Sequence, residues 1–281
     1  MDALTLSQLL ALAGLTFAAA TINGALGHGF STLTVPVALL WLSQRLLNPV
    51  LVLLEVVINL FAFLGSLGAF PSVARQVRPM ALALLPGIVV GGLVLRFVPA
   101  GPLKIATYAL LLPLALWQAY GRKPRRVPRP VAYGAVTGLL YGLTTLSGPV
   151  LSLYFHHHHT PKDQYRAAIS FLRLVESAAS ATVFLALGML GGDTVRAALP
   201  LLPGVALGLL AGHALLRWIP EGTFRRFCGL FNVFALSFGL SRLLTPKGLP
   251  PLAALALWLI PTGLVFLAKR RPEALPTEEA A

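Results

Sequence analysis

The sequence predicts an all-α polytopic membrane protein with two inverted repeats, each a broken helical hairpin plus three transmembrane helices, and one extra C-terminal helix. Of the 281 residues, 57% are hydrophobic and only 11% are charged, which is too apolar for a soluble domain of this size. Long apolar segments follow one another from end to end, without the short alternating strands of a membrane β-barrel. Two similar interruptions, rich in Gly, Ser, Thr and Pro, lie in corresponding halves.

Eleven apolar segments are candidate membrane helices, since a spanning helix needs about 20 apolar residues. They are residues 4–22, 30–43, 48–70, 79–98, 101–120, 130–143, 146–157, 165–190, 195–219, 222–245 and 249–268. The segments 30–43, 130–143 and 146–157 are short. We therefore pair 4–22 with 30–43, and 130–143 with 146–157, as hairpins that turn at the Gly/Ser/Thr breaks.

The two breaks are related in sequence. Residues 29–37 and 142–150 share Gly, Thr, Leu, Pro and Val at five of nine positions, with an offset of 113 (149 − 36). Further matches relate 84–87 to 201–204 and 95–101 to 216–222. This predicts an N-terminal repeat at 1–120, a basic cytoplasmic linker at 121–130, a C-terminal repeat at 131–245, and an extra helix and polar tail at 246–281.

The basic residues predict how the repeats are oriented. The net charge of +13 comes from short basic clusters between apolar segments, which are typical of cytoplasmic loops facing anionic lipid, not of nucleic-acid binding. With 121–130 inside, the basic segments 71–79, 158–166 and 219–226 also lie inside, and the repeats are inverted. If each break is instead a kink in one full crossing, the repeats are parallel.

Two predicted membrane helices carry polar stripes at helical spacing. The first contains Asn48, Glu55, Asn59 and Ser66; the second contains Arg166, Ser170, Arg173, Ser177 and Ser180, with Glu176 at its edge. Ionisable residues inside a membrane are candidates for a functional site.

Each charged residue has a functional and a structural interpretation. Arg173 would counter an anion, but Arg173 and Glu176 are three residues apart and can neutralise each other. Glu55 is a candidate for carrying a coupling proton, with Asn59 and His28 as further candidates, but Glu55 and Asn59 can equally form a polar clamp between helices.

The breaks supply the remaining candidate substrate-binding residues. Glycine lets the backbone approach a ligand, and hydroxyl groups donate hydrogen bonds to an anion. These residues also cap and pack helices, and a lone histidine is often structural. The candidates are Gly27, His28, Gly29, Ser31, Thr32, Thr34, Thr144, Thr145, Ser147 and Gly148.

Two other functions have some support in the sequence. The run His156–His159 suggests metal-cation transport, although a contiguous run seldom provides convergent ligands. Ser147 with His213 suggests an intramembrane serine hydrolase, but the first glycine of the usual Gly-x-Ser-Gly pattern is missing. We expect no enzyme activity, no resident metal and no cofactor.

The doubled Gly-x-x-x-Leu-x-x-Pro breaks, Leu146–Pro149, and Pro161-Lys162 before a polar-striped helix resemble the sulfite exporter TauE/SafE family, also called the toluene-sulfonate uptake permease family. The resemblance covers residues 8–245. It implies a multi-pass, bacterial-type carrier of sulfite, sulfonates or similar sulfur anions in the cytoplasmic membrane. It also implies that residues 27–36 and 142–149 line the substrate path. This chain departs from the denser glycine run often found at the first break, having His28 and Phe30 there.

These observations together predict a secondary transporter of a small sulfur-containing anion. The anion would bind between the two breaks, and one repeat would rock against the other to alternate access. No Gly-x-x-x-x-Gly-Lys loop for nucleotide is present. The expected partners are the anionic substrate and the lipid bilayer, without nucleic acid; a homodimer is compatible with the sequence.

Overall fold

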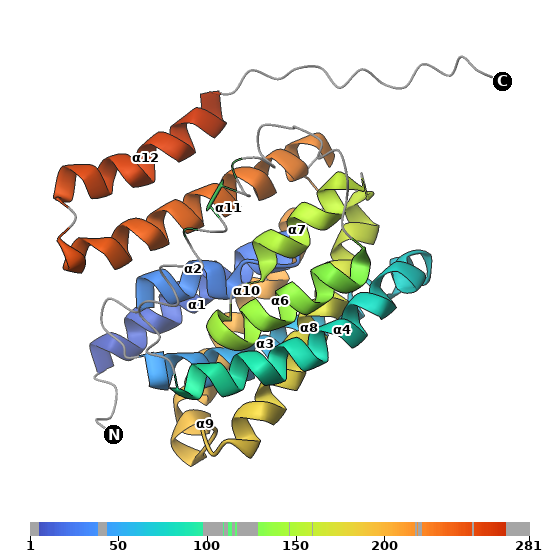
Figure 1. The fold of residues 1–281 in the computed structure, drawn as a ribbon, viewed down its shortest axis with the longest axis horizontal. Helices are drawn as coiled ribbons and strands as arrows, with labels where there is room; N and C mark the ends of the chain where they lie inside the picture. Colours follow the sequence, from blue (N-terminus) through green and yellow to red (C-terminus); the bar gives the residue numbers. More distant parts are fainter. Residues whose placement is uncertain are drawn as a thin grey trace.

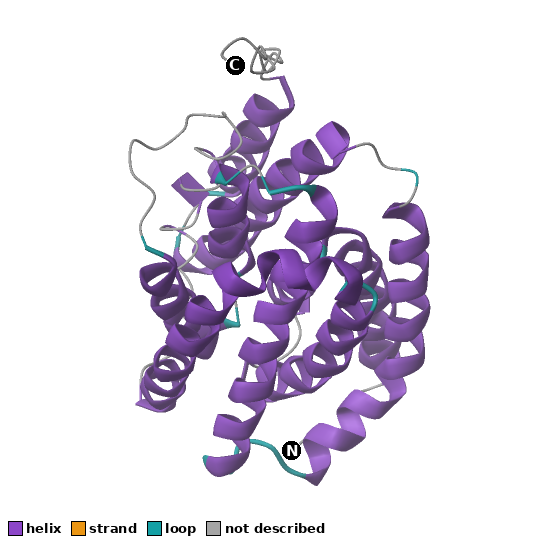
Figure 2. Cartoon of the chain, turned by 90° about the vertical axis from the view of Figure 1, so that its right-hand side faces the viewer, coloured by secondary structure: helices purple, strands orange, loops and turns teal. Residues whose placement is uncertain are grey.

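The described part of the chain consists of helices and the short connections between them. The computed structural model describes residues 6–38, 44–97, 109, 112–113, 116, 129–145, 147–158, 160–216, 218, 221–248 and 250–267. Helices within these residues are joined by short loops, and no strand occurs among them (Figure 2). The long helices pack side by side, and the last one lies at the edge of the bundle (Figure 1).

Residues 6–97, as far as they are described, form four α-helices and one short 3-10 helix: α1 (Leu6–Leu26), α2 (Phe30–Ala38), α3 (Gln44–Leu64), η1 (Leu67–Ala69) and α4 (Phe70–Phe97). The chain leaves α1 through Gly27 and Gly29, whose φ angles are 79° and 111°. Residues that carry a side chain rarely adopt such positive φ values, which explains why both positions are glycine.

The second half begins with the same succession of helices. Its elements are α6 (Pro130–Thr144), α7 (Gly148–His157), α8 (Lys162–Ala186), α9 (Gly192–Ala198), η2 (Leu199–Leu201), α10 (Leu202–Leu216), α11 (Glu221–Leu244), η3 (Thr245–Lys247) and α12 (Pro251–Leu267). Here Thr145, with φ 59°, takes the left-handed conformation at the break.

Five helical segments are long and apolar enough to cross a membrane, judged by their length and composition. They are residues 7–25, 47–64, 67–95, 162–186 and 192–215. Two shorter apolar helices, 130–143 and 252–265, accompany them. The predicted class, an all-α polytopic membrane protein, is therefore confirmed.

Some predicted boundaries are wrong. Residues 71–79, predicted as a cytoplasmic loop, form the first turns of α4, which continues through Pro79 and Pro86. The predicted helix 195–219 is divided into α9, η2 and α10. Most of the predicted helix 101–120 and the linker 121–130 lie outside the described residues.

The helix boundaries repeat along the chain at a constant interval. The ends of α1 and α6 differ by 118 residues (144 − 26), as do the starts of α2 and α7 (148 − 30) and of α3 and α8 (162 − 44). The sequence match at the breaks has an offset of 113, so it is displaced by five residues from the structural correspondence. At the structural interval, Gly27 corresponds to Thr145, and both have positive φ.

Helices from the two halves pack against each other along two glycine-lined seams, which we call the α1–α10 seam and the α4–α6 seam. In the first, Gly204 lies 3.6 Å (measured from an added Cβ) from the carbonyl oxygen of Ala13, and Gly212 lies against Thr21. Residue numbers therefore increase in the same direction along α1 and α10, so the two helices run parallel.

The α4–α6 seam has the same form. A methyl group added at Gly142 would lie 2.6 Å from the carbonyl oxygen of Ile88, and Gly134 lies against Met80. Small residues allow such close approach of helix backbones in membrane proteins. Because α1 and α4 correspond to α6 and α10, the seams are related by exchange of the two halves.

The helices α3 and α8 correspond to each other and run in opposite directions. The rings of Phe63 and Phe171 are 5.4 Å apart, while Asn59, earlier in α3, contacts Ser177, later in α8. Opposite directions for corresponding helices are expected of inverted repeats. The inversion of the whole units stays our prediction.

The apolar side chains form two main cores, each drawn from both halves of the chain. Core A is built from α4, α7 and α8 with Phe231 of α11, and core B from α1, α2, α3, α9, η2 and α10. A third cluster joins α6 and α7 to α11 and α12. The α3–α8 contact therefore lies where core A meets core B.

Candidate functional site

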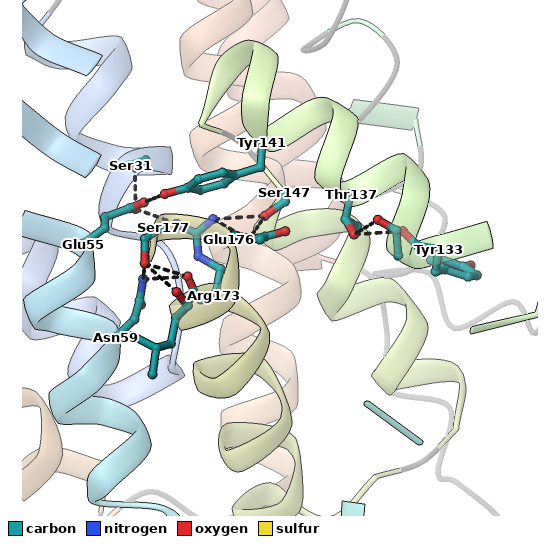
Figure 3. A network of polar contacts seen from close by, with 12 residues as sticks. Ser31, Glu55, Asn59, Tyr133, Thr137, Tyr141, Ser147, Arg173, Glu176 and Ser177 are labelled. Atoms are coloured by element: carbon teal, nitrogen blue, oxygen red, sulfur yellow. Dashed lines mark hydrogen bonds and ion pairs between the residues drawn. The ribbon is translucent and has the colours of Figure 1, made fainter. Parts of the chain in front are cut away.

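The polar stripes of α3 and α8 face each other inside the bundle and form a buried network (Figure 3). Glu55 is 11 residues beyond the start of α3 (55 − 44), and Arg173 is 11 residues beyond the start of α8 (173 − 162). At 1.5 Å per residue each lies about 16 Å along its helix, near the middle of a membrane. This is deeper than the seven residues expected from the sequence.

Arg173 is the centre of the network and is 2% exposed. Its Nη2 donates to Oε1 of Glu55 at 2.5 Å, and its Nη1 donates to Oε2 of Glu176 at 3.2 Å. The same Nη1 also donates to Oγ of Ser147 at 3.0 Å. One guanidinium therefore holds two carboxylates from different helices, an arrangement that its planar fork of donors favours.

Glu55 is held by hydroxyl groups as well as by the guanidinium. Ser31, in the first turn of α2, donates to Oε1 of Glu55 at 2.5 Å, and the Tyr141 hydroxyl on α6 donates to Oε2. The guanidinium carbon of Arg173 lies 4.7 Å from the centre of the Tyr141 ring. Both oxygens of the carboxylate are thus hydrogen-bonded, which a buried ion requires.

Glu176 is bound less completely. Its Oε2 accepts hydrogen bonds from Ser147 at 2.6 Å and from Arg173 at 3.2 Å. Its Oε1 is buried and has no hydrogen-bond partner among the described residues. The second carboxylate therefore has an oxygen available to a proton or a ligand.

Asn59 fastens α3 to α8 one turn beyond Glu55. Its Nδ2 donates to the backbone oxygen of Arg173 at 3.2 Å and to Oγ of Ser177 at 3.3 Å. Glu55 and Arg173 are 118 residues apart, and so are Asn59 and Ser177, so corresponding positions of the two halves contact each other. Such contacts occur where an approximate two-fold axis passes between two corresponding helices.

The structure brings together several of the predicted site residues from both halves. Ser31, Ser147, Glu55, Asn59 and Arg173 all belong to this network. The pairing of Arg173 with Glu176 and the clamp formed by Asn59 are the structural roles that the sequence also suggested. In this conformation Arg173 is paired with Glu55 and Glu176, and its role as a counter-ion for an anion stays a prediction.

The two breaks also meet. A methyl group added at Gly148 would lie 3.0 Å from Cδ2 of His28, so the imidazole packs directly against the second break. His28 is fully buried, and its ring centre is 6.2 Å from that of Tyr165. Gly29 packs against Phe231 of α11, so the first break is enclosed on that side.

The remaining predicted residues, Thr32, Thr34 and Thr145, are buried near the breaks. The backbone N–H of Thr145 donates to the carbonyl oxygen of Tyr141 at 2.8 Å. The Thr34 hydroxyl has no hydrogen-bond partner among the described residues. Thr144 ends α6, but its side chain lies outside the described part.

Sequence reasoning missed Tyr141 as a member of the site. Nothing in its spacing distinguishes it from the other aromatic residues, and only its contact with Glu55 reveals its role. Arg166 and His213 were not chosen as binding residues, although Arg166 belongs to the polar stripe. The backbone of Arg166 on α8 lies next to Gly27 of the first break.

The geometry does not favour the serine hydrolase, and the metal-cation alternative stays a prediction. Ser147 bonds to Arg173 and Glu176, whereas His213 lies beside Arg166, seven residues earlier on α8. Among the described residues no group of three His, Cys, Asp or Glu side chains could hold a metal ion. The side chains of His156, His157 and His159 are outside the described part.

Charged side chains that meet in the middle of membrane-length helices define the class: a polytopic membrane protein with an intramembrane ionisable site. The sequence matches the family model described as sulfite exporter TauE/SafE over residues 12–240. The chain therefore belongs to the sulfite exporter TauE/SafE family, as the resemblance at the breaks predicted. No curated protein and no solved structure gives a significant match.

Proposed function

We propose that this chain is a secondary transporter that moves a small sulfur-containing oxyanion, sulfite or a sulfonate, across the cytoplasmic membrane. Family membership supports the substrate class. The observation that carries the mechanism is the buried network in which one guanidinium, Arg173, lies between Glu55 and Glu176.

The charge of this network favours coupling to protons. With both carboxylates ionised, one guanidinium and two carboxylates leave a net charge of −1 in a buried site, which repels an anion. A proton on Glu55 or Glu176 neutralises the network and releases part of the Arg173 fork. Proton uptake would therefore precede or accompany the approach of the substrate.

The position of the network supports alternating access. Glu55 belongs to a helix of core B, whereas Arg173 and Glu176 belong to a helix of core A. A movement of one core against the other changes the distances between these three groups. Substrate and proton binding would thus be linked to the conformation of the transporter.

The experiment measures transport in proteoliposomes that contain a pH-sensitive dye. The substrates are sulfite and methanesulfonate, the latter because it stays ionised and does not cross the lipid unaided. We expect wild-type protein to move these anions faster than empty liposomes do, together with protons. Glu176→Gln should uncouple or stop proton movement.

Asp193→Asn is the matched control, because it also removes one carboxylate but at an exposed position, 66% exposed at the side chain. It should transport like the wild type. Wild-type fluxes equal to those of empty liposomes for both anions would refute the transport function. Equal proton movement in wild type and Glu176→Gln, with anion flux intact, would refute the coupling role of Glu176.

A further inference from the structure

A second buried guanidinium lies outside the network. Arg166 is on the same stripe of α8, seven residues before Arg173, which is about 10 Å along the helix. It is 5% exposed. The first break lies directly against it, because a methyl group added at Gly27 would be 3.7 Å from its Cα.

The hydrogen bonds of Arg166 leave some N–H donors of its guanidinium group unused. Its Nη2 donates to the backbone oxygen of Gly24 at 2.9 Å and lies 3.4 Å from Nδ1 of His213 on α10. Its Nε is buried and has no hydrogen-bond partner among the described residues. A guanidinium has five N–H groups, so this side chain has donors to spare.

Arg166 also makes no direct ion pair with a described carboxylate. The ion pairs within the described residues join Arg173 to Glu55 and Glu176, and Arg196 to Asp193; none includes Arg166. A buried cation without a counter-ion is costly, and the usual remedy is a carboxylate or a bound anion. Within the described residues two carboxylates bond directly to Arg173, whereas Arg166 has only the more distant, exposed carboxylate of Asp163, three residues earlier on α8.

We propose that Arg166, together with His213, forms the oxyanion-binding position of the transporter, beside the first break and separate from the Glu55–Arg173–Glu176 network. This rests on the proposed transport of a sulfur oxyanion. The Nε and Nη edge of a guanidinium matches two oxygens of a sulfite or sulfonate group. The lone counter-ion that the sequence assigned to Arg173 is thereby assigned to Arg166.

A purely local role for Arg166 is the competing explanation. Gly24 is in the last turn of α1, and its carbonyl has no partner further along that helix. Arg166 therefore caps α1, as a basic side chain at a helix C-terminus often does. Capping predicts an effect on stability alone, whereas anion binding predicts an effect on affinity.

The test measures the dissociation constant of sulfite by calorimetry on detergent-solubilised full-length protein, and the thermal stability without sulfite. The variant is Arg166→Gln, and the control is Arg78→Gln, which removes the same charge from an exposed position on α4. Charge-assisted hydrogen bonds lost to the anion should weaken sulfite binding about tenfold or more in Arg166→Gln. Arg78→Gln should bind sulfite with the wild-type constant.

A wild-type sulfite constant in Arg166→Gln, with or without lower thermal stability, would overturn the proposal and leave Arg166 as a cap. If Arg166→Gln does not fold, the sulfite dissociation constant of Arg166→Lys is measured instead. It keeps the charge but lacks the fork, so sulfite affinity should fall several-fold, and an unchanged constant overturns the proposal. Wild-type protein that neither binds nor transports sulfite or methanesulfonate would instead refute the transport function itself.

Discussion

Replacing Arg173 by methionine should destabilise the protein strongly. Methionine has a similar length but no charge, so it removes the one cation that holds Glu55 and Glu176. Both carboxylates would then remain buried, at 1% and 0% exposure, without a counter-ion. Neither can turn to water without moving α3 or α8.

The magnitude follows from the bonds that are lost. Arg173 makes two charged hydrogen bonds, of 2.5 and 3.2 Å, and one to the Ser147 hydroxyl of 3.0 Å. Removing one partner of a buried ion pair costs about 3–5 kcal/mol, because the other charge stays buried and unpaired. With a second carboxylate affected, we expect Arg173→Met to lie at the upper end of this range.

The assay is unfolding in mixed micelles with increasing SDS, followed by circular dichroism, from which the free energy of unfolding is obtained. Arg196→Met is the matched control. Its ion pair with Asp193 is 3.7 Å long and exposed, so its loss should change stability by less than about 1 kcal/mol.

A triple variant separates the charge effect from packing. Glu55→Gln, Glu176→Gln and Arg173→Met together remove every charge of the network, and should recover much of the stability lost in Arg173→Met while abolishing transport. An Arg173→Met protein as stable as Arg196→Met would refute the buried ion-pair network, and a triple variant no more stable than Arg173→Met would refute the charge argument.

Three further predictions concern a seam, the buried network and a break, and each is measured by the same SDS unfolding. Gly142→Ala should lose about 1–3 kcal/mol because its methyl group overlaps the α4 backbone, whereas Gly14→Ala, with no neighbouring atom within 4 Å, should gain up to about 1 kcal/mol; equal effects would contradict the close seam. Tyr141→Phe should lose about 1.5–3 kcal/mol, the value of a hydrogen bond to a carboxylate, and slow transport; wild-type values would show that this bond is dispensable. Gly27→Ala should lose about 1–2 kcal/mol because its φ of 79° is unfavourable for alanine, and a stability gain like that of Gly263→Ala in an open helical position would exclude the left-handed conformation.

The sequence was sufficient for the fold class because hydrophobic length and polar stripes are local properties. The stripe spacing placed Glu55, Asn59 and Arg173 on inward faces, and their burial agrees with this. Helix boundaries were less predictable. Pro79 looked like a helix start, yet α4 begins at Phe70 and passes through it.

The composition of the site could be predicted only in part, because contacts between distant helices are not encoded in spacing. Whether Arg173 is free to bind an anion or is paired with a carboxylate depends on whether α3, which carries Glu55, packs against α8. Tyr141 could not be recognised for the same reason. The glycines spaced four apart in α6 and α10 were not singled out in the sequence, and their close packing against α4 and α1 became clear only from the structure.

The two parallel seams have a consequence for movement. Since α4 is joined to α6 and α1 to α10, neither half of the polypeptide is a mechanical body by itself. A hinge at the midpoint of the chain would have to pull both seams apart. The proposed movement of core A against core B would take place between α3 and α8. Each moving body would then combine helices from both halves of the chain.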